Sequence, residues 1–128
     1  MANPNIVAVA AIYGNTSTNL ISSTADPFAT ALVSNAASSG KVFKINSIVA
    51  ANVDGTSAAD ITINVYSAAA LGGTAFPIAS TISVPADATL IITDKTTSFY
   101  LLENQSIGAT AGSASDLVVT ASWEEINS

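Results

Sequence analysis

The segment Lys41–Val53 reads KVFKINSIVAANV, and its apolar residues alternate with polar ones. This period of two residues is typical of a β-strand with one buried face. That face is predicted to carry Phe43, Ile45, Val49, Ala51 and Val53. Ile48 interrupts the alternation, which indicates either a bulge or a strand covered on both sides.

Similar short runs follow, separated by turn residues such as Asp54-Gly55 and Gly72-Gly73. Because Glu is absent between residues 1 and 102, exposed helix faces would lack the charged residues that usually cover them. About seven short strands at this spacing predict an all-β protein, a single antiparallel β-sandwich or jelly roll. The first of the later runs, 61–66, is expected to pair with 41–53. The remaining runs are 78–84, 90–92, 99–102, 107–111 and 117–124.

The first forty residues have a different character. A strand is expected over Ile6–Tyr13, but residues 15–40 are rich in Ser, Thr, Asn and Ala and have weak periodicity. Such a segment is either a long connection within the domain or an arm that orders against a neighbouring subunit. We therefore expect an N-terminal strand and polar arm at 1–40 and a β-sandwich body at 41–128, together one domain. The candidate anchors of the arm are Ile6, Tyr13 and Phe28.

The composition excludes several kinds of chemistry. The 128 residues include no Cys and no His, so there is no thiol nucleophile, no imidazole base and no ordinary zinc site. Three lysines against nine carboxylates give a net charge of -6, which disfavours binding to nucleic acid. No apolar run approaches the ~20 residues of a membrane-spanning helix. We therefore predict a non-enzymatic protein with no catalytic residues, no cofactor and no metal, and no nucleic-acid or membrane partner.

Only a few residues suggest binding. Asp54 and Asp60 flank one loop and are a conceivable hard-cation site, although Asp is also a common turn residue. Tyr66 and Tyr100 lie opposite the apolar phase of their strands, which makes them the candidate outer-face aromatics of a sugar-binding platform. Trp123 shares its phase with the apolar residues before it and is expected in the core.

Four segments carry a resemblance to a known class of proteins: Lys41–Thr56, Ile82–Leu90, Tyr100–Ile107 and Val119–Ile126. Their sequence of strands and turns resembles the small β-sandwich virion structural proteins of tailed phages, particularly cyanophages. The resemblance covers the whole chain and is firmest from residue 41 onward. It implies a structural role in the virion, with no enzymatic residues to carry over.

Small side chains and few charges also suit a chain that packs against copies of itself, since little charge must be desolvated in an interface. We expect a capsid decoration or cement protein that stabilises the shell of a bacteriophage. Its partners would be the major capsid protein and further copies of the chain, as a trimer, in a virion assembled in the host cytoplasm. The alternatives are a tail, baseplate or fibre-associated structural protein, and a carbohydrate-binding module.

Overall fold

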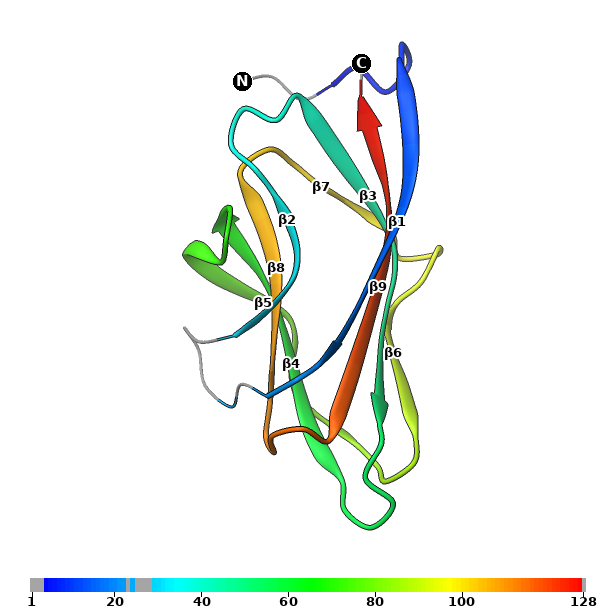
Figure 1. Ribbon diagram of the computed structural model, residues 1–128, viewed down its shortest axis with the longest axis vertical. Coiled ribbons are helices and arrows are strands. Elements are labelled where there is room, and N and C mark those ends of the chain that lie inside the picture. Colours follow the sequence, from blue (N-terminus) through cyan, green and yellow to red (C-terminus); the bar gives the residue numbers. More distant parts are fainter. Residues whose placement is uncertain (1–3, 23, 25–28, 128) are drawn as a thin grey trace.

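The computed structural model describes residues 4–22, 24 and 29–127, and these residues form nine strands and no helix. The strands are arranged in two sheets that face each other (Figure 1). Every ladder in both sheets is antiparallel. The strands are β1 (Ala11–Leu20), β2 (Thr30–Asn35), β3 (Lys41–Asn52), β4 (Ala59–Ala68), β5 (Gly72–Val84), β6 (Thr89–Thr93), β7 (Phe99–Leu101), β8 (Gln105–Ala111) and β9 (Leu117–Asn127).

The order of the strands is that of a jelly roll. Sheet A has the order β1-β9-β3-β6, and the short β7 pairs with the other half of β3. Sheet B has the order β2-β8-β4-β5. Strands that are consecutive in sequence therefore often lie in opposite sheets, as in the double Greek key of a jelly roll. The predicted fold class, an all-β antiparallel sandwich, is confirmed.

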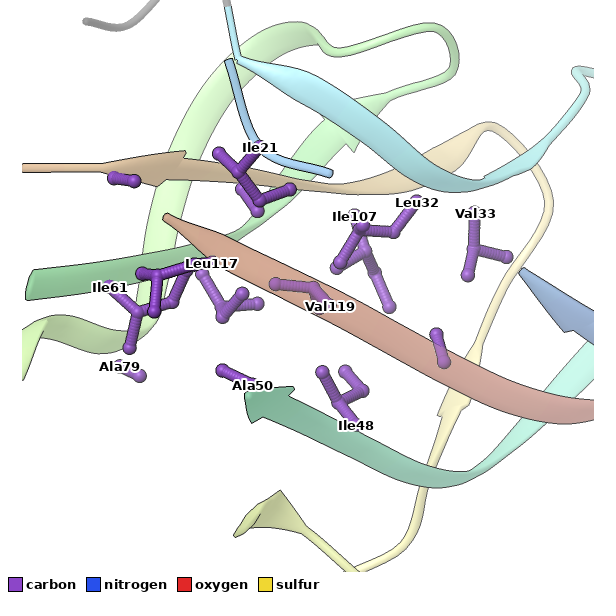
Figure 2. Packing of buried hydrophobic residues seen from close by; sticks show 14 of the residues in the cluster. Ile21, Leu32, Val33, Ile48, Ala50, Ile61, Ala79, Ile107, Leu117 and Val119 are labelled. Carbon is purple, nitrogen blue, oxygen red and sulfur yellow. The ribbon is translucent and has the colours of Figure 1, made fainter. Parts of the chain in front are cut away.

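The core lies between the two sheets (Figure 2). Sheet A contributes Ile45, Leu117 and Val119, and sheet B contributes Ile61 and Ile107, all of them fully buried. At one end of the core the ring of Trp123 stacks on that of Phe43, with centroids 6.2 Å apart. The prediction that Trp123 packs with the core is confirmed.

A bulge in β3 changes which residues face the core. The register between β3 and β9 shifts between Ile45 and Ser47, and a second shift follows against β6 between Ile48 and Val49. Because one extra residue reverses the alternation, Ile48 and Ala50 point inward and are fully buried. The expected inward direction of Val49 and Ala51 is therefore wrong, whereas the irregularity expected at Ile48 is present.

The segments 41–53 and 61–66 do not pair, so that expectation is wrong. β3 pairs with β6, β7 and β9 in sheet A, whereas β4 pairs with β5 and β8 in sheet B. The connection between β3 and β4 crosses from one sheet to the other, which local sequence patterns do not reveal.

The polar N-terminal segment contributes a strand to each sheet. β1 pairs with β9 along its whole length, from Ala11 to Leu20, and β2 pairs with β8. The first strand thus begins later than the expected Ile6–Tyr13 and continues through the Asn, Ser and Thr residues. These side chains suit an edge strand because backbone hydrogen bonds, and not apolar burial, hold it in the sheet.

Two buried asparagines join the loops to the sandwich. Asn52, at the end of β3, donates from Nδ2 to the carbonyl oxygens of Ser57 and Val84, each at 2.9 Å. Its Oδ1 accepts a hydrogen bond of 2.9 Å from the Asp54 amide. Asn35, at the end of β2, donates to the carbonyl oxygens of residues 41 and 101. Each amide therefore satisfies backbone groups that would otherwise be buried without a partner.

Candidate interaction surfaces

The described residues contain no pocket and no group of three or more Asp or Glu side chains placed to hold a metal ion. Within the same residues, no helix is long and apolar enough to cross a membrane. The candidate sites are therefore surfaces: the acidic loops, the outer face of sheet A and the edge strand β5.

Two loops repeat one arrangement, an aspartate that binds the threonine two residues later. The Asp54 carboxylate accepts hydrogen bonds from the Thr56 amide at 2.8 Å and hydroxyl at 2.9 Å. The Asp94 carboxylate accepts the equivalent bonds from Thr96, at 2.9 Å and 2.6 Å. The described residues place Asp54 and Asp60 in no group of three or more carboxylates, and the Asp54 carboxylate is hydrogen-bonded within its own turn.

These hydrogen bonds lower the pKa of both carboxyl groups below the ordinary value of 3.8. A lowered pKa in the folded state means that the turns contribute stability above the ordinary value and lose it as the pH falls through the lowered one. For Asp54 the largest cause is the Thr56 amide, whereas for Asp94 it is the Thr96 hydroxyl.

We therefore expect Thr96→Val to raise the pKa of Asp94 more than Thr56→Val raises the pKa of Asp54. The reason is that valine removes the hydroxyl donor but keeps the backbone amide. Side-chain carboxyl chemical shifts, followed by NMR from pH 2 to pH 6 (roughly the range in which Asp titrates), measure both values. Equal shifts in the two variants, or none, would contradict the assignment of the donors.

Tyr66 lies on the outer face of sheet B, as expected, but its side chain is only 2% exposed. The turn between β4 and β5 folds back against β8, where the Leu71 amide donates to Ser106 Oγ at 2.9 Å. A Cβ on Gly108 would lie 2.8 Å from Leu71 Cδ2 and 3.1 Å from Tyr66 Cε2, so both side chains pack over this glycine. Tyr66 is therefore not available as a sugar-binding platform, which corrects the expectation for this residue.

Tyr100 is accessible on the outer face of sheet A, with 43% of its surface exposed. In β7 it pairs with Lys44 of β3, Lys44 pairs with Glu124 of β9, and Glu124 pairs with Gly14 of β1. These four residues form a straight line across the sheet, which we call the Tyr100 row. It places a tyrosine, a lysine and a glutamate at paired positions on three adjacent strands.

The edge strand β5 has an unusual number of exposed apolar side chains. Phe76 and Ile82 pair with Val65 and Ile61, whose side chains face the interior, yet they are 58% and 41% exposed. Ile78 is 44% exposed. We call these three residues the β5 flank. β5 has 13 residues, whereas its counterpart at the edge of sheet A, β6, has five, so β6 is too short to face β5 along its whole length.

The expected anchors of the N-terminal arm are exposed where the structure describes them. Ile6 is 50% exposed and Tyr13 is 58% exposed, while Phe28 lies outside the described residues. Tyr13 belongs to β1 and pairs with Glu125, so it is part of sheet A and not of a separate arm. An anchoring role for these residues stays a prediction.

Comparison with known proteins finds a likeness among solved structures. No protein-family model and no curated protein matches the chain. Among solved structures, a chain of Bacillus endospore appendages, described as a novel family of disulfide-linked pili, superposes with a TM-score of 0.52. The two chains are 17% identical, and the match covers 99% of this chain and 100% of the other. At this identity the likeness supports the fold alone.

Proposed function

We propose that this chain is a non-enzymatic structural subunit that assembles with other protein chains through the β5 flank. The observation that carries the proposal is that three apolar residues of β5, Phe76, Ile78 and Ile82, are exposed. The 13 residues of this edge strand include no charged side chain. Edge strands of monomeric proteins are usually protected by charged residues or by an interruption of the strand. Exposed apolar residues gathered on one edge are typical of interaction sites.

The backbone of β5 favours contact through side chains over extended pairing with a neighbouring strand. Pro77 lacks an amide donor, and Thr81 adopts a φ of 51°, so the edge is interrupted twice. A partner would therefore gain most from covering Phe76, Ile78 and Ile82. Full burial of a fully exposed side chain of this size contributes about 1.5–3 kcal/mol, and each of these residues, which are 41–58% exposed, would contribute a part of that.

The first setting that we propose is the capsid of a tailed phage, with the chain as a decoration or cement protein on the major capsid protein. The resemblance of its strand and turn segments to virion structural proteins supports this setting. The chain would occur as a homo-oligomer, with a trimer as the working hypothesis, in virions assembled in the host cytoplasm. A copy number comparable with that of the major capsid protein is then expected, and a much lower one would favour the tail.

The second setting is a surface appendage, which the likeness to the Bacillus pilus chain favours. That family is described as disulfide-linked, whereas these 128 residues contain no cysteine. Copies of this chain would therefore associate without disulfide links between them. Electron microscopy of the purified protein distinguishes the settings, because an appendage subunit polymerises alone and a decoration protein needs a shell.

We expect Phe76→Asp to weaken association of the chain about 30-fold or more, because the new carboxylate would have to be desolvated in the interface. The matched control is Val53→Asp, which adds the same charge at a residue that is 57% exposed and lies outside β5. Sedimentation velocity over a concentration series measures association. Equal weakening by both variants would indicate a general charge effect and contradict a role of the β5 flank.

A further inference from the structure

We propose that the Tyr100 row is a binding site for a neutral oligosaccharide. This site is separate from the β5 flank, because it lies on the outer face of sheet A whereas β5 belongs to sheet B. The proposal begins with the register, which aligns Tyr100, Lys44, Glu124 and Gly14 on four adjacent strands. At about 4.8 Å between strands, the row is about 14 Å long, the size of a short oligosaccharide.

The polar groups of the row are not used inside the chain. In the described residues the Lys41 ammonium lies 3.6 Å from the Glu125 carboxylate, but Lys44 and Glu124 belong to no ion pair. Nor does Lys44, Glu124 or Tyr100 have a side-chain hydrogen bond within that part of the chain. Three donors on the ammonium, acceptors on the carboxylate and the phenol hydroxyl are therefore available to a ligand.

The charges select the class of ligand. Lys44 and Glu124 cancel each other, so neither an anion nor a cation is favoured over a neutral molecule. The net charge of -6 further disfavours nucleic acid and other polyanions. A sugar offers hydroxyl groups that both donate and accept, and its C–H face stacks on an exposed aromatic ring such as Tyr100. The donor, acceptor and ring of the row match this combination.

One neighbouring row offers further hydroxyl groups to the same ligand. On one side, Thr16, Ser122 and Ser47 form a cross-strand line of hydroxyl groups. Gly14, at the end of the Tyr100 row, leaves open space, because a Cβ built there would have no atom within 4 Å. A sugar ring could therefore lie flat beside Glu124 with further hydroxyl partners at its edge.

The test is a ¹H–¹⁵N NMR titration of the full chain with maltotetraose, cellotetraose and chitotetraose. At least one of them is expected to shift the amide signals of Gly14, Lys44, Tyr100 and Glu124. Tyr100→Ala should weaken binding about tenfold, whereas Tyr100→Phe keeps the ring and should retain most of the affinity. Gly14→Val should block binding without loss of folding, since the new side chain enters open space on an edge strand.

The matched control is Tyr13→Ala, because Tyr13 is 58% exposed and belongs to the same sheet but has the opposite phase. It should bind like the unmodified chain. Absence of binding by all three sugars, or unchanged binding by Tyr100→Ala, would overturn the proposal. The proposal would also be overturned if the amide signals of the row shifted with protein concentration in the absence of sugar. The row would then be a contact between copies of the chain.

Discussion

Replacing Ile107 with alanine is expected to lower the free energy of unfolding by about 2–5 kcal/mol. Ile107 is fully buried in β8, where it pairs with Val65 of β4 and Val33 of β2. It lies in the middle of sheet B and faces the core, so the sheets cannot close over the cavity that alanine would leave.

The matched control is Ile91→Ala, because Ile91 is also an isoleucine in a strand but is 60% exposed. This change should alter the free energy of unfolding by no more than about 0.5 kcal/mol. Urea unfolding followed by circular dichroism measures both variants. If the two changes cost the same, Ile107 would not lie in the core and the packing of the two sheets would be wrong.

Replacing Asn52 with alanine is expected to cost about 2–4 kcal/mol, because three hydrogen bonds are lost together. The Val84 carbonyl would lose a partner in a buried position, and the connection between β3 and β4 would lose its attachment at Ser57. Asn52 is 3% exposed, so water cannot easily replace the amide.

Asn52→Asp provides the decisive comparison because it keeps the size of the side chain. At pH 7 its carboxylate would still accept from the Asp54 amide, but it would face two carbonyl oxygens without a proton to donate. We expect this variant to be at least as unstable as Asn52→Ala at pH 7 and to recover part of the loss at acidic pH, where the carboxyl is protonated. Thermal unfolding at pH 7 and at acidic pH measures the stability of the variant. If Asn52→Asp were as stable as the unmodified chain at pH 7, the role of the amide would be contradicted.

The sequence was sufficient for the fold class but not for the arrangement of strands. The alternation around Phe43 and Trp123 predicts strands and their inward residues wherever the ladder is regular. It fails in β3 after Ile45, because one bulged residue reverses the phase of all that follow. It also misses β1 beyond Tyr13, because the Thr and Asn side chains there give no apolar pattern although the strand is fully paired.

The candidate sites were less predictable for the same reason. Phase alone placed Tyr100 on an outer face, but the row requires knowing that β9 lies between β1 and β3. Lys44 and Glu124 are 80 positions apart, and only the register makes them neighbours. For Tyr66 the phase correctly predicted an outward direction but not the burial, because the turn between β4 and β5 covers the side chain.

The central claim, that the chain is a structural subunit assembled through the β5 flank, is tested most directly by hydrogen–deuterium exchange. Amide exchange across Gly72–Val84 should be compared between dilute protein and the largest assembly that forms. That assembly is either one of this chain alone or one of this chain bound to a capsid shell. We expect this edge segment to gain protection in the assembly, while the exposed loop around Gly55 does not. A chain that stays monomeric in both settings, or an assembly in which β5 exchanges as fast as in the monomer, would contradict the claim.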